Sequence, residues 1–71
     1  MTREERLRQS FQTSTPPEVL TRLSRDRDFG VRYCVAYNLS TPLELLLILI
    51  VDDDEYVRQQ AEVVLSKRVK P

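Results

Sequence analysis

The sequence contains no histidine, no tryptophan, one cysteine and one glycine among its 71 residues. The single cysteine, Cys34, excludes an internal disulfide, and without histidine we expect no zinc site built by this chain alone. A lone glycine, Gly30, makes a glycine-rich phosphate-binding loop implausible. No nucleophile–base pair or carboxylate pair stands in a catalytic pattern. The composition therefore predicts a protein that is not an enzyme and uses no cofactor.

Charge and hydropathy exclude other classes. Eleven basic and eleven acidic residues balance, so no overall field attracts the chain to nucleic acid or to an anionic membrane. The longest apolar run, 45–51, is far shorter than the roughly 20 residues of a membrane-spanning helix. The charged first residues, 1–5, are unlike a secretory signal. We therefore expect a cytoplasmic protein that does not enter the membrane.

What the sequence does contain is a repeat with an offset of 26 residues. The segment STPPEVL at 14–20 returns as STPLELL at 40–46, and 12 of the 27 positions in 14–40 are identical in 40–66. A period of about 20–50 residues is typical of solenoids, in which each unit buries its apolar face only against its neighbours. Such proteins mostly bind other macromolecules, so the repeat predicts a binding function without naming the partner.

Each repeat opens on Thr-Pro-x-Glu, at Thr15 and Thr41. Proline suits the first helical position, and a glutamate three residues after the threonine completes a capping box. The first helix of each repeat is expected to run to about Arg25 and to about Val51.

Aspartates then start the second helix of each repeat. Asp28 and Asp54 stand where an N-cap is expected, and the helices should end near Asn38 and at about Arg68. Residues 2–12 fit the same frame as a degenerate half-repeat, with a capping box at Thr2.

The predicted fold is therefore all-α, with five helical segments and no strand. We divide the chain, as one domain, into an N-terminal cap (1–13), repeat 1 (14–39), repeat 2 (40–66) and a C-terminal tail (67–71).

The repeat resembles a known family in one specific pattern. Thr-Pro-x-Glu-x-Leu-x-x-Leu-x-x-Asp-x-Asp-x-x-Val-Arg, followed in the first copy by Val35-Ala36-x-Asn38, is similar to the leucine-rich repeat variant, and its Asp…Val-Arg core looks like the wider HEAT and armadillo-like class. The resemblance implies a bacterial protein, a right-handed superhelical stack of helices and a protein-binding role. The second copy departs from the pattern at Glu62 and Val64.

One type in that family carries an iron–sulfur cluster on a cysteine-rich N-terminal segment. Cys34 alone cannot build such a cluster. A role as an accessory to metal-cluster proteins therefore rests on the resemblance only.

The first helices of the two repeats differ most on their outer sides. Repeat 1 has Thr21, Arg22, Ser24 and Arg25 where repeat 2 has Leu47, Ile48, Ile50 and Val51. A helix that is apolar nearly all round is normally buried nearly all round. We therefore predict that this second set is an interface for self-association or for a partner protein, and the alternative is that the C-terminal helix folds back over it.

Arginines recur at the start of the second helices. We expect Arg32 and Arg58 to pair with the turn aspartates Asp26 and Asp52 and so to set the register between repeats. Arg6 is a possible third member. The alternative is that these arginines bind phosphate or an acidic peptide.

Several smaller features have simple explanations. The acidic run 52–55 lacks the length and the glycine of a calcium loop, and helix capping explains it. Cys34 is expected to be a small packing residue, and Tyr33, Tyr37 and Tyr56 half-buried packing residues or contact aromatics. The arginine-rich N-terminal end gives the alternative function, a nucleic-acid-associated adaptor of HEAT-like type, although interspersed acids dilute that surface.

Overall fold

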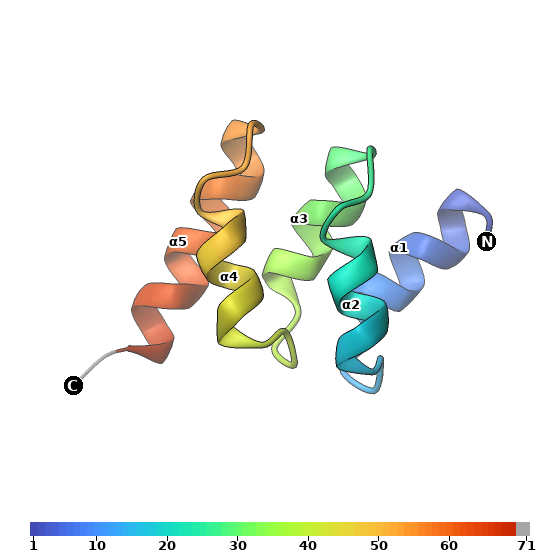
Figure 1. Ribbon diagram of the computed structural model, residues 1–71, viewed down its shortest axis with the longest axis horizontal. Coiled ribbons are helices and arrows are strands. Elements are labelled where there is room, and N and C mark those ends of the chain that lie inside the picture. Colours follow the sequence, from blue (N-terminus) through green and yellow to red (C-terminus); the bar gives the residue numbers. More distant parts are fainter. Residues whose placement is uncertain (70–71) are drawn as a thin grey trace.

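The computed structural model describes residues 1–69, and within them the fold is five α-helices without a strand (Figure 1). The predictions of an all-α fold and of five helices are confirmed for this range. The helices are α1 (Arg3–Phe11), α2 (Pro17–Leu23), α3 (Phe29–Tyr37), α4 (Leu43–Leu49) and α5 (Glu55–Arg68). Helix α5 includes Lys67 and Arg68, so the tail proposed at 67–71 begins inside a helix, and its last two positions lie outside the described residues.

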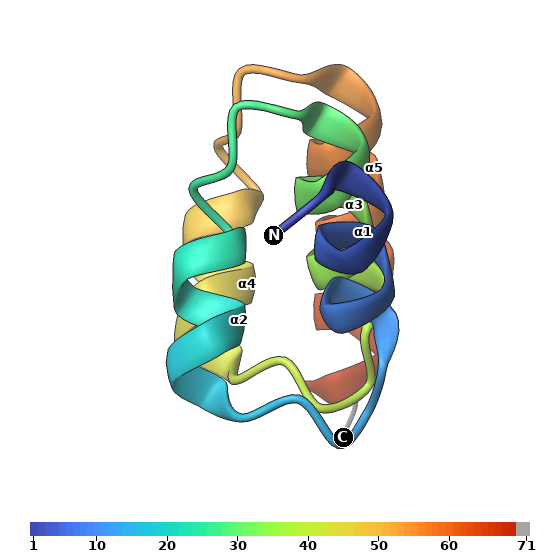
Figure 2. The ribbon, with the colours of Figure 1, turned by 90° about the vertical axis from the view of Figure 1, so that its right-hand side faces the viewer.

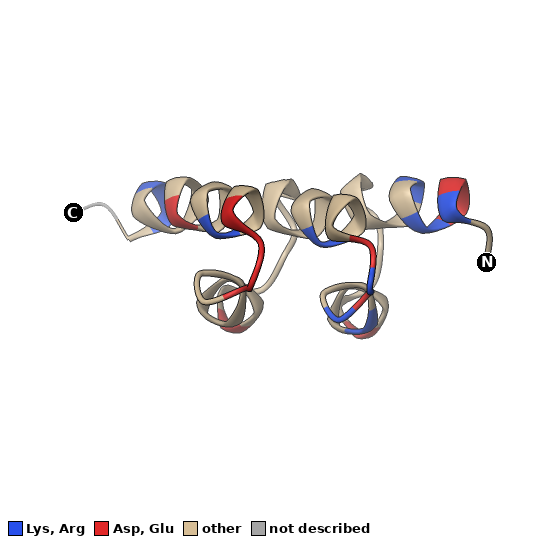
Figure 3. Cartoon of the chain, turned by 90° about the horizontal axis from the view of Figure 1, so that it is seen from above, with Lys and Arg blue, Asp and Glu red and all other residues tan. Residues whose placement is uncertain are grey.

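The helices form two layers. Figures 2 and 3 show α1, α3 and α5 in one layer and α2 and α4 in the other, so each repeat gives one helix to each layer. Helix α3 packs between α1 and α5. The Cα atoms span 38 × 25 × 14 Å, which makes a flat body with two broad outer faces.

Three of the predicted helix caps are present. Thr2 and Glu5 form a complete capping box at α1. The Asp28 carboxylate accepts a hydrogen bond from the backbone N–H of Gly30 at 2.8 Å, and Asp54 caps α5 in the same way. These bonds satisfy backbone donors that would otherwise lack a partner in the first turn.

The predicted capping boxes at Thr15 and Thr41 are wrong. The N-cap residues are Pro16 and Pro42, neither helix start has a side-chain cap, and both threonines are buried. Their hydroxyls point to the preceding helix instead: Thr15 Oγ1 donates to the Gln9 carbonyl at 2.6 Å, and Thr41 Oγ1 to the Val35 carbonyl at 2.5 Å. A buried hydroxyl needs an acceptor, and the last turn of a helix supplies carbonyls that have no helical partner.

Helices α2 and α4 end two residues earlier than predicted. The N–H groups of Arg25 and Val51 bond to carbonyls three residues back, at 3.1 and 3.2 Å. This tight turn ends each helix before the aspartate turn that follows.

The core is aliphatic and runs between the two layers. Its buried side chains are Leu20, Leu23, Val31, Val35, Ala36, Leu45, Leu46, Leu49, Val57, Ala61 and Val64. Leucine comes from α2 and α4, whereas valine and alanine come from α3 and α5. The repeat therefore preserves the packing of one layer on the other.

Candidate interaction surfaces

The outer face of α4 is apolar and open to solvent. Leu47, Ile48 and Val51 are 50%, 53% and 77% exposed, and Leu43 adds to the same side. The alternative prediction, that the C-terminal helix covers this stripe, is wrong, because α5 lies in the other layer (Figure 2). Ile50 does not belong to the exposed set, since it is partly buried and packs against the core.

The matching face of α2 is polar. Arg22 and Arg25 are exposed, and Thr21 is partly buried. Ser24 was predicted to lie on this outer side, but it is buried and its Oγ donates to the Thr21 carbonyl at 2.6 Å. Ser24 and Ile50 occupy equivalent positions, so the C-cap residue of each first helix faces inward in both repeats.

Arginines connect consecutive aspartate turns. Arg6 Nε donates to the Asp26 carboxylate at 2.8 Å, and Arg32 Nε donates to the Asp52 carboxylate at 2.9 Å. A second bond, from Arg32 Nη2 to Asp52 at 3.2 Å, makes this pair bidentate. In each pair the arginine precedes its aspartate by 20 residues.

Arg32 and Arg58 also hold the turn just before their own helix. Arg32 Nη1 donates to the Asp26 carbonyl at 2.6 Å, and Arg58 Nη1 donates to the Asp52 carbonyl at 2.7 Å. Arg58 differs from Arg32 in forming no carboxylate pair within residues 1–69. These bonds use the donors of Arg32 inside the protein, so that residue is not available to bind phosphate or an acidic peptide.

The pairing of Arg32 with Asp52 shifts the pKa of both residues. Burial of the Arg32 guanidinium acts to lower its pKa, but the hydrogen bond and charge of Asp52 outweigh this, and the pKa is raised. Burial likewise acts to raise the pKa of Asp52, but the Asp54 N–H and Arg32 outweigh it and the pKa is lowered. Both groups stay charged together, which is the condition for the pair to contribute to stability.

The acidic run before α5, the red turn in Figure 3, is explained by these contacts. Asp52 binds Arg32, Asp53 approaches Arg32 Nη2 at 3.2 Å, and Asp54 caps α5. In the part of the chain that the structure describes, no three histidine, cysteine, aspartate or glutamate side chains gather as a metal site requires.

Sequence reasoning missed a set of bonds that close the loops between helices. Asn38 is buried, and its Nδ2 donates to the carbonyls of Ser10 at 2.9 Å and Gln12 at 2.8 Å. Ser40 Oγ donates to the Thr13 carbonyl at 2.6 Å. The loop before α2 is thereby held by side chains from the loop that follows α3.

At the loop before α4, one arginine replaces these residues. Val64 stands where the repeat has Asn38, and Arg68 donates to the carbonyls of Asn38, Leu39 and Thr41. Asn38 and Leu39 lie 26 residues after Gln12 and Thr13, so the accepting carbonyls are equivalent. The only sequence signal was the loss of asparagine at position 64 together with a long donor four residues later.

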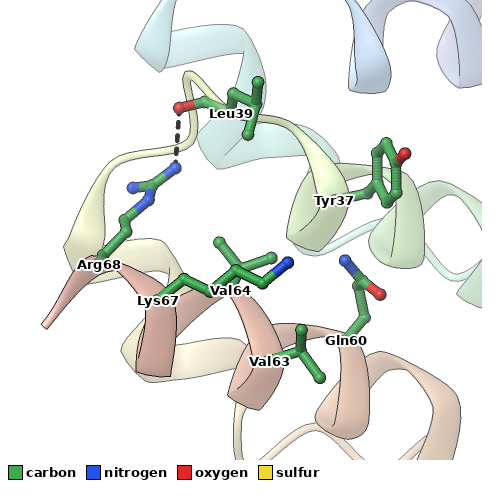
Figure 4. A pocket seen from close by; sticks show the side chains of 7 residues that line it. All are labelled: Tyr37, Leu39, Gln60, Val63, Val64, Lys67 and Arg68. Atoms are coloured by element: carbon green, nitrogen blue, oxygen red, sulfur yellow. Dashed lines mark hydrogen bonds between the residues drawn. The ribbon is translucent and has the colours of Figure 1, made fainter. Parts of the chain in front are cut away.

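Beside Arg68 a groove opens between the end of α3 and α5 (Figure 4). It encloses about 290 Å³ and is lined mainly by apolar side chains. The lining residues are Tyr37, Leu39, Gln60, Val63, Val64, Lys67 and Arg68.

All five aromatic residues are exposed. Phe11, Phe29, Tyr33, Tyr37 and Tyr56 lie on or in α1, α3 and α5, with exposures from 37% to 63%. The expectation that the tyrosines are half-buried packing residues is therefore wrong for Tyr37 and Tyr56, and the core uses aliphatic side chains instead.

Cys34 is free and partly buried. Within residues 1–69, no helix is both long and apolar enough to cross a membrane.

Comparisons with known protein families, with curated proteins and with solved structures give no match.

Proposed function

We propose that this protein is a small, non-enzymatic scaffold for protein–protein interaction that self-associates through the outer face of α4. The observation that carries this proposal is the exposure of Leu47, Ile48 and Val51, which are 50%, 53% and 77% accessible. Contiguous exposed apolar patches on soluble proteins mark interaction sites. We place this function in the cytoplasm and assign it to a binding module without cofactor.

The proposed architecture behind this function is a right-handed superhelical stack of two repeats and a half-repeat of leucine-rich-repeat-variant type. Bonds that recur at the 26-residue offset support it. Thr15 and Thr41 bond to equivalent carbonyls, and Arg6 and Arg32 bond to equivalent aspartates. Recurrence of these contacts is what is expected if each repeat meets the next in the same geometry.

A second copy of the chain is the occupant that the α4 face fits best. Leu43 and Leu47 are four residues apart on α4, so they lie on one side of the helix, and exposed Val51 follows in the turn after it; two such apolar surfaces can pair about a twofold axis. Exposed Glu44 on α4 and exposed Arg22 and Arg25 on α2 offer opposite charges on either side of that axis.

Light scattering at several concentrations, in low and high salt, tests the proposal. We expect a dimer or larger species that persists in high salt, because burial of apolar surface is not screened by ions. The double variant Leu47→Glu with Val51→Lys should be a monomer with unchanged helical circular dichroism. The matched control, Thr21→Glu with Arg25→Lys, places the same side chains at the equivalent positions of α2 and should still associate.

Two results would contradict the proposal. A wild-type protein that is monomeric at the highest concentration excludes self-association. A double variant that associates as the wild type does places the interface on another face.

The alternative function is a nucleic-acid-associated adaptor. Exposed arginines at the N-terminal half favour it: Arg8, Arg22, Arg25 and Arg27 form no ion pair within the described residues, whereas Arg3 and Arg6 are paired with aspartates. Binding to DNA that weakens steeply with salt, and weakens further in an Arg22→Glu variant, would support this function over the first.

A further inference from the structure

The groove beside Arg68 lies at the second of two loop junctions, which are closed by different side chains. At the first junction, Asn38 lies buried against the loop and fills the space between helix and carbonyls. At the second, Val64 has no donor, and Arg68 reaches the loop from one turn further along α5. A short side chain close to the loop is thus replaced by a long one that bridges it, and the space of about 290 Å³ remains open beside Val64.

The rim of this groove is unusually apolar for a solvent-facing site. Tyr37, Leu39 and Val63 are 60%, 79% and 49% exposed, and they come from α3, the loop after it and α5. Figure 4 shows Tyr37 and Val63 on opposite sides of the opening. Covering such groups gains about 25 cal/mol per Å² of apolar surface. The groove therefore favours an apolar ligand group.

The positive charge of Lys67 at the rim further restricts which ligand groups the groove can bind. No acidic residue lines the groove, and Lys67 forms no ion pair within residues 1–69. Arg68 Nη1 and Nη2 already donate to the loop carbonyls, so of the two cations that line the groove Lys67 is the more open to a ligand. An anionic group next to the apolar one would complement this site.

The size of the groove limits the ligand. Pockets for small molecules and cofactors usually enclose about 300–1,000 Å³. A volume of about 290 Å³ is at the lower limit and suits one or two side chains of a polypeptide.

We propose that this groove binds a short segment of a partner protein that carries an aliphatic side chain next to a carboxylate. The aliphatic group lies between Tyr37 and Val63, and the carboxylate pairs with Lys67. The groove belongs to the layer of α1, α3 and α5, whereas the self-association stripe belongs to α4, so the two surfaces serve different partners at the same time. The proposal stands independently of the self-association proposed above.

Nuclear magnetic resonance of the ¹⁵N-labelled chain tests it with three capped tripeptides: acetyl-Glu-Leu-Glu-amide, acetyl-Lys-Leu-Lys-amide and acetyl-Glu-Ser-Glu-amide. We expect the first to shift the amide signals of Tyr37, Val63 and Lys67 with millimolar affinity. The lysine and serine peptides should bind at least fivefold more weakly, because one repels Lys67 and the other lacks the apolar group.

A charge reversal keeps the test decisive. In Lys67→Glu, the acidic leucine peptide should lose affinity at least fivefold and the lysine peptide should gain it, which a misfolded protein could not show. The matched control, Arg8→Glu, reverses a charge in the last turn of α1 and should leave both affinities unchanged.

Four results would overturn the proposal. They are the absence of shifts at several millimolar peptide, shifts centred on Leu47 and Ile48, serine and leucine peptides that bind equally well, and a Lys67→Glu variant without effect on either peptide. Shifts of the same residues by oligothymidylate, without shifts by the acidic leucine peptide, would identify a nucleic-acid site instead.

Discussion

Helices α2 and α4 bury the same residues and expose different ones. On the inner side Leu20 corresponds to Leu46 and Leu23 to Leu49, and all four are buried. On the outer side, a cationic face on α2 corresponds to an aliphatic face on α4. Within one chain, then, the inner positions are restricted by packing while the outer positions are free to differ. The difference between the repeats is a guide to function because packing cannot account for it.

The largest effect on unfolding free energy should come from removing a buried leucine that both repeats share. Leu20→Ala and Leu46→Ala each remove a fully buried side chain at equivalent positions, and each should cost about 2–5 kcal/mol of unfolding free energy. Urea denaturation followed by circular dichroism measures both. If α2 and α4 are equivalent supports, the two losses agree; a loss in only one variant would show that a single repeat carries the stability.

The next largest effect on stability should come from the loops before α2 and α4, which are closed by different side chains. Asn38→Ala leaves the Ser10 carbonyl and the Ser40 N–H without a partner and removes one of the two hydrogen bonds to the Gln12 carbonyl, in a largely buried site, and should cost about 2–3 kcal/mol. Arg68→Ala removes donors from a more exposed loop that water can reach, and should cost about 1 kcal/mol. Thermal denaturation measures both variants, and equal losses of unfolding free energy would contradict the distinction between the two junctions.

The arginine–aspartate pair between the repeats should make a moderate, pH-dependent contribution. Asp52→Asn removes the charge that Arg32 binds and should cost about 1–2 kcal/mol at neutral pH. Because the pKa of Asp52 is lowered in the folded protein, its contribution is complete above its unfolded pKa of about 3.9 and is lost as the pH falls through the folded value.

Denaturation between pH 7 and pH 2 checks this sign. The wild type should lose stability as the solution becomes acidic, and Asp52→Asn should lose less. Some dependence will remain, because the hydrogen bond from Arg3 and the N–H of Gly30 also lower the pKa of Asp28. A variant with the same acid sensitivity as the wild type would show that this pair does not contribute.

The smallest effect on stability should come from transferring the exposed face. Thr21→Leu, Arg22→Ile and Arg25→Val together give α2 the outer residues of α4, and the unfolding free energy should change by about 0.5 kcal/mol or less. Association should nevertheless become stronger, as measured by light scattering. A triple variant that associates no more than the wild type would show that self-association depends on the position of α4 in the stack and not on its exposed residue types.

The sequence predicted the helices well because helix signals are local and were present twice. Asp28 and Asp54 act as the caps that their spacing indicated. The failures arise where a side chain contacts another element of the fold. Thr15 and Thr41 fit a local capping box, but burial against the preceding helix gave their hydroxyls a different acceptor.

The candidate surfaces were only partly predictable. Comparison of the repeats identified Leu47, Ile48 and Val51, since each is an apolar residue at a position where repeat 1 has a threonine or an arginine. It also assigned Ile50 to that face, because the helix was expected to continue and the tight final turn was not foreseen. The groove was missed for a different reason: it depends on the path of Arg68 across a loop, and no local pattern encodes such a path.

The double use of Arg32 makes the 26-residue unit a module that can be inserted. This residue binds the carbonyl of Asp26 and the carboxylate of Asp52, two groups that are one period apart. A copy of 27–52 inserted after Asp52 would meet a matching carbonyl behind it and supply a matching carboxylate ahead. The protein can thus be lengthened by whole 26-residue periods. An insertion of any other length would leave the guanidinium of an equivalent arginine away from the turn that it binds.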